Sequence, residues 1–168
     1  MTQFPTSTTV PAGLSVALYK GTRPGLDGLY NRVGRMLDRG PYSHCEMVFS
    51  NGISASSSFL DHGVRIKGIG YSSIGHWDFM PIADPSGAME AAAWAWFYSH
   101  MGAPYDVLGN IRFAFGFARD SFDKWFCSEA VMAALGYDEP WRYGPSGAAT
   151  ALKHDFKTQI IEVPKNGR

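Results

Sequence analysis

Nucleophilic chemistry is the reaction type best suited to the cysteines and histidines of this chain. Cys127 lies near the start of an apolar run, and His44 precedes it by about 80 residues. A thiolate is a strong nucleophile, and an imidazole beside it can take the thiol proton even when the two residues are far apart in sequence. We therefore interpret Cys127 as a candidate nucleophile and His44 as its candidate base.

A helix is expected to position Cys127. The run over 124–135 contains neither Pro nor Gly and places Cys127, Val131 and Leu135 on one helical face. Cys127 then lies in or near the first turn, where unpaired backbone N–H groups and the helix dipole favour a thiolate. The alternative is a buried cysteine with no chemical role, which is common on apolar helix faces. Three residues of the types that cap helices precede the run: Asp120, Ser121 and Asp123.

A strand is expected to position His44. Residues 43–49 alternate, with His44, Glu46 and Val48 on one face. Cys45 falls on the opposite face with Met47 and Phe49, and we interpret it as a core residue. His44 could also be a hydrogen-bonded histidine on a half-buried strand, without a catalytic role.

Two residues are candidates to orient the imidazole. Asn51-Gly52 is a signal for a two-residue hairpin, which would pair Ser50 with Ile53. That register places Ser57 opposite Glu46 and on the His44 face. Glu46 lies on that face by alternation. Either residue could instead be an ordinary surface group.

The remaining pattern predicts an α+β fold in which an antiparallel sheet packs against helices, because strands and helices are largely segregated along the chain. We expect a polar arm over 1–12 and a single domain over 13–168, a length that suits one hydrophobic core. Strands are predicted over 14–19, 43–49, 63–69, 76–82 and 159–163, and helices over 25–37, 85–101, 124–135 and 146–153. Residues 105–117 are expected to form a further apolar helix or a pair of turns.

Composition limits the classes of partner. The chain has 15 Lys+Arg and 15 Asp+Glu, so a partner held mainly by charge, such as nucleic acid or an anionic membrane, is not expected. No secretory signal and no membrane-spanning run is visible, which predicts a chain that is cytoplasmic as made. The two cysteines lack a disulfide-framework spacing and read as free thiols.

Several short motifs, in order, resemble those of circularly permuted papain-like cysteine hydrolases of the NlpC superfamily, in particular the YiiX-like branch and, more distantly, lecithin:retinol acyltransferase. The landmarks are Ser43-His44-Cys45-Glu46, Gly63-Val64-Arg65, Gly102-Ala103-Pro104-Tyr105-Asp106, Phe126-Cys127-Ser128-Glu129 and Gly144-Pro145-Ser146. They span about residues 14–163, and the Ser-His and Cys-Ser-Glu pair is the most specific of them.

The resemblance implies a permuted papain-like domain with the base on a barrel-like sheet and the nucleophile at the start of a packed helix. Carried over by position, Cys127 is the nucleophile and His44 the base. The third residue of such sites is polar, often an acid, on the strand after the histidine. The corresponding stretch, 54–59, contains no acid. The third role therefore stays open between Ser57, by register, and Glu46, by charge.

The implied reaction is hydrolysis of an amide or ester through a thioacyl intermediate, without a cofactor. Amides of peptidoglycan stem peptides are the leading substrate that the resemblance implies, followed by acyl-lipid or other small amides. A cell-wall substrate combined with a missing signal would fit a phage protein released by lysis or carried in a virion.

Two other classes of function compete with this interpretation. A metal site could draw on His44, Cys45, Glu46, His62, His76 and Cys127, although no pair of them has a zinc-motif spacing. A binding module on the same fold could use its tryptophans: Trp77, Trp94, Trp96, Trp125 and Trp141. Most of these have core spacing, and Trp141 is the one we expect to be exposed.

Overall fold

A computed structural model describes residues 10–22, 35, 38, 40–68, 71, 73–107 and 123–164. In these ranges the protein has the predicted α+β architecture, with a five-stranded antiparallel sheet in the order β4-β3-β2-β1-β5. Most of the two predicted segments over 25–37 and 105–117, and residues 1–9 of the predicted arm, lie outside the described residues.

The elements agree closely with the predicted ones. The strands are β1 (Ser15–Tyr19), β2 (His44–Val48), β3 (Ile53–Ser58), β4 (Gly63–Gly68) and β5 (Trp77–Pro81). The helices are α2 (Ala88–Ser99), α4 (Cys127–Ala134) and α5 (Pro145–Asp155), with 3-10 turns η1 (Ile74–His76) and η2 (Pro140–Arg142). The predicted strand over 159–163 is wrong in extent, because only Ile161 pairs there, in a single bridge to Phe79.

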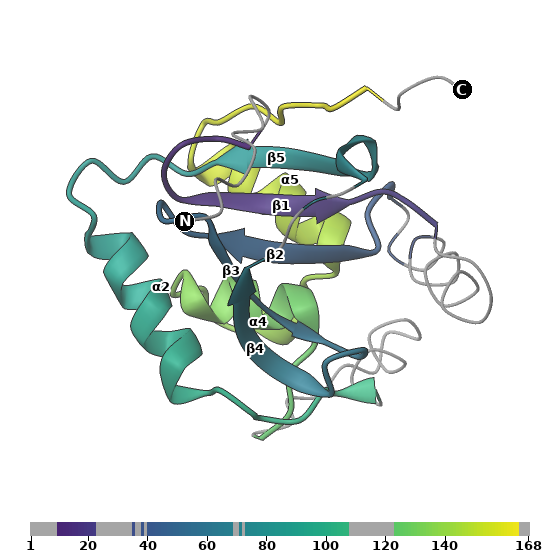
Figure 1. Ribbon diagram of the computed structural model, residues 1–168, viewed down its shortest axis with the longest axis vertical. Coiled ribbons are helices and arrows are strands. Elements are labelled where there is room, and N and C mark those ends of the chain that lie inside the picture. The colour runs from purple at the N-terminus through teal and green to yellow at the C-terminus, as the bar shows by residue number, and fades with distance from the viewer. Residues whose placement is uncertain are drawn as a thin grey trace, which may run out of the picture.

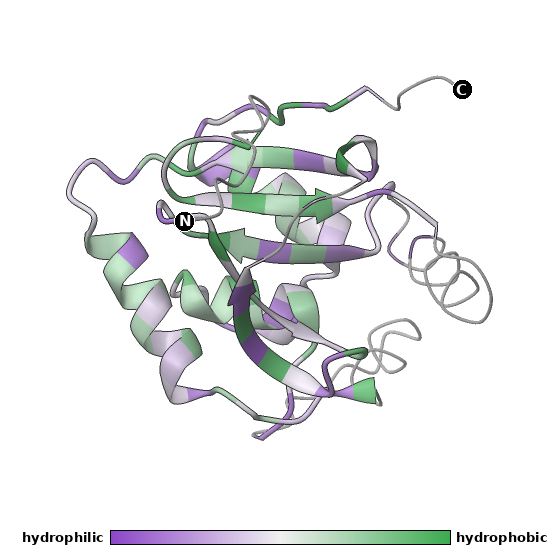
Figure 2. Ribbon diagram, in the orientation of Figure 1, coloured by the Kyte–Doolittle hydropathy of each residue, from purple (hydrophilic) through white to green (hydrophobic). Residues whose placement is uncertain are grey.

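Helices α4 and α5 cover one face of the sheet, and α2 runs along its flank (Figure 1). The main core lies on that face and includes Val16, Leu18, Cys45 and Met47. A smaller cluster on the opposite face contains Ala17, Tyr19, Val48, Trp77 and Phe79. β1 contributes alternate residues to both clusters and is hydrophobic along most of its length (Figure 2). Cys45 is therefore a core residue, as predicted.

The β2–β3 hairpin has a different register from the predicted one. Met47 pairs with Ala55 and Val48 with Ser54, one residue away from the expected alignment. The loop holds three residues instead of two: the Gly52 N–H donates to the Phe49 carbonyl at 2.9 Å, and Gly52 has φ +79°. The Asn51 side chain accepts from the Ile53 N–H at 2.9 Å. An Asn-Gly pair suits this turn as well, since a left-handed glycine also closes three-residue loops.

Helix α4 begins at Cys127, later than the predicted residue 124, because the backbone before it is extended. Trp125 forms a parallel bridge with Tyr105, and its N–H donates to the Pro104 carbonyl at 3.1 Å. The helix ends at Ala134 with Leu135 as its C-cap, and Gly136, whose φ is +81°, follows the cap. Among the helices that the structure describes, none is long and apolar enough to cross a membrane.

Candidate functional site

Cys127 is the first residue of α4 and is only 3% exposed. Phe126, with φ −100° and ψ 171°, is the N-cap. Its N–H donates to the Glu129 carboxylate at 3.1 Å. The N-cap is therefore not one of the three capping-type residues that precede the run, Asp120, Ser121 and Asp123. The first backbone N–H groups of a helix have no intrahelical acceptor and carry the positive end of the dipole. This position stabilises a thiolate and could hold an oxyanion.

The structure brings His44 to Cys127. His44 is the first residue of β2, and its imidazole interacts with the Cys127 side chain by hydrogen bonding and by charge. Burial disfavours the charged imidazole, but the Cys127 thiolate and then Glu46 outweigh it and raise the pKa of His44 to about 9. Both shifts, upward for the pKa of His44 and downward for that of Cys127, favour a thiolate facing an imidazolium.

Cys45 also contacts the Cys127 thiol, which the sequence did not predict. A hydrogen bond from the Cys45 side chain is the largest cause that lowers the pKa of Cys127 well below its usual range, followed by the charge of His44 and a hydrogen bond from it. The same hydrogen bond and burial raise the pKa of Cys45 well above its usual range. Cys45 therefore stays protonated and donates to its neighbour.

Glu46 is the residue that holds the imidazole. Its Oε1 lies 3.1 Å from Nε2 of His44, two residues earlier on β2. The carboxylate is 3% exposed, and burial alone would raise its pKa. His44 and Arg65 outweigh burial and lower the pKa of Glu46, so it stays ionised and stabilises the imidazolium.

Ser57 does not lie beside His44, which corrects the prediction made from the two-residue hairpin. The observed register turns Ser57 toward the same face as Ala55, which is part of the main core. Its hydroxyl donates to the Trp125 carbonyl at 2.6 Å, two residues before Cys127. Ser57 thus supports the segment that leads into α4 and does not touch the imidazole.

Arg65 is a charged residue of the site that the sequence analysis did not select. Its Nη2 lies 2.6 Å from Oε1 of Glu46, and its Nε lies 3.1 Å from Oδ2 of Asp61. Arg65 pairs with Ser56 across β3 and β4, and the β2–β3 register continues this row to Glu46. The sequence does show a basic residue on β4 and an acidic residue on β2, two strands apart. To predict that Arg65 and Glu46 meet, however, one must know the register of the hairpin between them.

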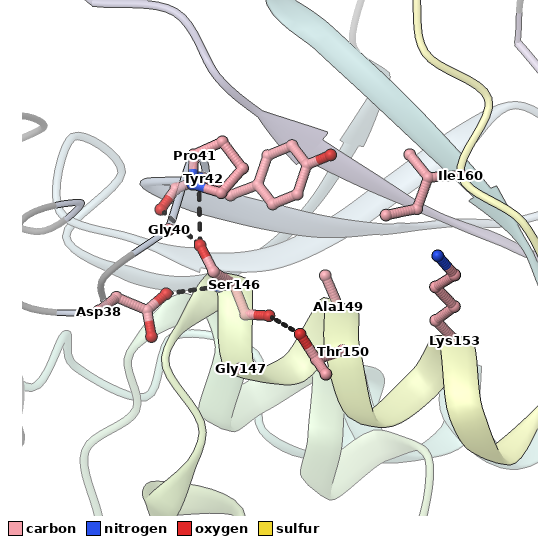
Figure 3. A pocket seen from close by; sticks show the side chains of 10 residues that line it. All are labelled: Asp38, Gly40, Pro41, Tyr42, Ser146, Gly147, Ala149, Thr150, Lys153 and Ile160. Carbon is pink, nitrogen blue, oxygen red and sulfur yellow. Dashed lines mark hydrogen bonds between the residues drawn. The ribbon is translucent and has the colours of Figure 1, made fainter.

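A cavity of about 450 Å³ lies between the segment before β2 and one side of α5 (Figure 3). Tyr42 and Ala149 form its buried part, and Asp38 and Lys153 lie toward opposite ends. Oδ2 of Asp38 accepts from the Ser146 N–H at 2.5 Å, at the start of α5. Burial raises the pKa of Asp38, and the charge of Cys127 contributes in the same direction, so this end of the cavity is within electrostatic reach of the thiolate.

The structure also places the other candidate metal ligands and two of the candidate tryptophans. Among the described residues, no group of three His, Cys, Asp or Glu could hold a metal ion. Trp77 is buried, and Trp141 is partly buried in η2 and not fully exposed as expected. His62 lies at the β3–β4 turn and His76 in η1, where its ring contacts Tyr19 edge-on.

Comparison with known proteins adds no assignment. No protein-family model matches the chain, and no curated protein matches it either.

Proposed function

We propose that this protein is a cysteine hydrolase that cleaves an amide or ester bond through a thioacyl intermediate. The observation that carries the proposal is the placement of Cys127 at the start of α4 beside His44, whose Nε2 is held by Glu46 at 3.1 Å. The pKa shifts of the two residues, downward for Cys127 and upward for His44, support it. A buried thiol needs no such environment for packing, whereas a nucleophile does.

The proposed reaction uses Cys127 and His44 in turn. The Cys127 thiolate attacks the substrate carbonyl carbon, and the carbonyl oxygen gains the negative charge near the first N–H groups of α4. The imidazolium of His44 then donates its proton to the leaving nitrogen or oxygen as the C–N or C–O bond breaks. Neutral His44 next takes a proton from water, the resulting hydroxide attacks the thioester, and release of the acid restores the thiolate and imidazolium.

The cavity beside α5 is the proposed binding site for part of the substrate. Its floor is apolar at Tyr42, Ala149 and Ile160, while Asp38 and Lys153 supply opposite charges. A short peptide with both charges fits this lining better than an aliphatic chain does. Peptide amides are therefore preferred over acyl lipids as substrates, and a cell-wall stem peptide is the leading member of that class.

The fold and biological setting follow from the same proposal. A sheet carrying His44 and a helix starting at Cys127 are the arrangement expected of a permuted papain-like domain of the NlpC type. A phage protein, made in the cytoplasm and released by lysis or carried in a virion, would bring such an enzyme to the cell wall.

Alkylation of the thiols, located by mass spectrometry, tests the proposal. We expect iodoacetamide to label Cys127 rapidly at about pH 6, well below the ordinary thiol pKa of about 8.5. His44→Ala should abolish labelling at that pH, and Cys45 should stay unlabelled in both proteins. The acyl-enzyme is then sought as a mass increase on Cys127 after mixing with activated peptide esters and peptide amides. An ordinary thiol profile unchanged by His44→Ala would overturn the proposal and favour a binding module.

A further inference from the structure

Glu46 shares one carboxylate oxygen between two cationic side chains. Oε1 lies 3.1 Å from Nε2 of His44 and 2.6 Å from Nη2 of Arg65. The exposed fractions of the three side chains are 17% for His44, 12% for Arg65 and 3% for Glu46. Charges that are this poorly solvated interact more strongly than surface pairs do.

The contact between Arg65 and Glu46 is a single hydrogen bond and not a two-bond fork. Oε2 of Glu46 and Nη1 of Arg65 are both buried and have no hydrogen-bond partner among the described residues. Arg65 therefore competes with His44 for the same oxygen while the second oxygen is unused. Arginine–carboxylate pairs are frequently two-bond forks, and this pair instead leaves one oxygen and one terminal guanidinium nitrogen unused within the described part of the chain.

Arg65 is itself fixed from the β3–β4 turn. Asp61 accepts from Nε of Arg65 at 3.1 Å and from Nζ of Lys67 at 2.5 Å. Lys67 reaches Asp61 but has no contact with Glu46 among those described, which makes it a natural control.

We propose that Arg65 is a positioning residue that fixes the Glu46 carboxylate and, by taking part of its charge, limits how tightly His44 holds its proton. The inference rests on the proposed function, in which His44 must both accept and release a proton. A carboxylate devoted to His44 alone would stabilise the imidazolium further and slow proton transfer to the leaving group. Arg65 therefore keeps Glu46 in place to orient the imidazole and at the same time keeps the imidazole from becoming too basic.

Several other groups face His44 and also influence its pKa or its position. Cys127 faces it from α4, and Tyr19 is its partner across β1. The Trp77 ring on β5 lies 6.3 Å from the imidazole, centroid to centroid. Tyr71 and Asp61 act at longer range, through Glu46 and Arg65 respectively. Among these groups Arg65 is the cation that shares an acceptor with the imidazole.

The test is the titration of the His44 imidazole, followed by NMR on histidine-labelled protein and assigned with His44→Ala. Arg65→Gln keeps a donor for Glu46 but removes the charge, and we expect it to raise the pKa of His44 by about one unit. Glu46→Gln should lower it by a similar amount. Arg65→Lys, which keeps the charge, and Lys67→Met, which removes a cation from Asp61 only, should leave it near the wild-type value.

Opposite shifts in Arg65→Gln and Glu46→Gln support the inference, because a merely structural role would shift both in one direction or neither. No shift, or a downward shift, in Arg65→Gln overturns it. If that variant does not fold, Arg65→Met is titrated in its place with the same expectation, and if neither folds Arg65 is a stability residue and the inference is wrong. The titration requires no turnover, so failure to trap an acyl-enzyme would reject the proposed function independently of this result.

Discussion

The thiols of Cys45 and Cys127 interact where α4 packs on β2, and their pKa values are displaced in opposite directions. Cys45 comes directly after His44 in the chain, so two consecutive residues of one strand both act on the same sulfur. One supplies a positive charge and the other a hydrogen bond. The Cys127 thiolate is thus stabilised from β2 as well as from the start of its own helix.

Cys45→Ala should make Cys127 less acidic, because it removes the largest single cause of the lowered pKa. We expect the pH midpoint of Cys127 alkylation to rise in Cys45→Ala. It should rise less in Cys45→Ser, because serine keeps a hydrogen-bond donor. The measurement is the labelling rate between about pH 5 and 9, a range that spans the ordinary thiol pKa. Identical profiles in the wild type and both variants would contradict the assigned hydrogen bond.

Cys127→Ala should lower the pKa of His44 from about 9, since the thiolate is the leading cause that raises it. Burial lowers this pKa, and of the two side chains that oppose burial in the wild type, Glu46 alone remains in the variant. Stability contributed by protonated His44 is full below the unfolded pKa of about 6.5 and is lost as pH rises through the folded value. In the variant that loss should occur at lower pH. Denaturation by urea at a series of pH values checks this, and a curve unchanged from the wild type would argue against the ion pair.

Gly63→Ala should destabilise the protein by at least about 2 kcal/mol. Gly63 has φ +151°, and an added Cβ would lie 2.0 Å from the Ala103 carbonyl oxygen. That backbone cannot move freely, because the Val64 N–H donates to the same carbonyl at 2.9 Å. Gly68→Ala, at the other end of β4 with no atom near its added Cβ, is the matched control and should change stability by less than about 0.5 kcal/mol. Equal effects of the two substitutions in urea unfolding would refute the assigned close approach.

Asp78→Ala should cost about 3 kcal/mol of stability, because three donors lose a buried acceptor. Asp78 accepts from Lys20 Nζ at 2.5 Å, from the Tyr42 hydroxyl at 3.0 Å and from the Val163 N–H at 2.9 Å. Asp138→Ala, at an exposed position, provides the comparison. Hydrogen exchange at Val163 should accelerate in Asp78→Ala alone, and a protected amide there would contradict this assignment.

Lys153→Met should weaken binding of peptide substrates that carry a carboxylate, by about tenfold for one lost charge-assisted contact. Lys157→Met is the control, because Lys157 is exposed, lies just beyond the C-cap of α5 and does not line the cavity. Comparison of KM for amidated and free-acid forms of one peptide isolates the effect. Equal losses for the two forms, or for the two lysine variants, would exclude the cavity as the carboxylate site.

The sequence predicted the fold at the level of its elements, because strand alternation and helical spacing reflect burial directly. The assignment of Cys45 to the core is confirmed by its place among the buried residues of the main cluster. The position of Cys127 in the first helical turn is also confirmed. Both follow from local patterns that tertiary packing reinforces.

The hairpin register and the orienting group were harder to predict, because a one-residue slip reverses every side chain of β3. Asn51-Gly52 suits both two-residue and three-residue loops, so the sequence did not distinguish Ser57 from Ser56 as the neighbour of Glu46. The role of Arg65 depends on the same register. Two strand alignments that differ by one residue fit the local sequence equally well, and tertiary packing decides between them.

The dependence of the Cys127 environment on β2 makes the two thiols reporters of folding. In the native state Cys127 should react and Cys45 should not, because the contact between them lowers the pKa of the Cys127 thiol and raises that of the Cys45 thiol. Unfolding removes that contact, so Cys127 slows at mildly acidic pH while Cys45 becomes accessible. The ratio of label on the two cysteines then measures the native population in a sample, with no tag, substrate or optical probe.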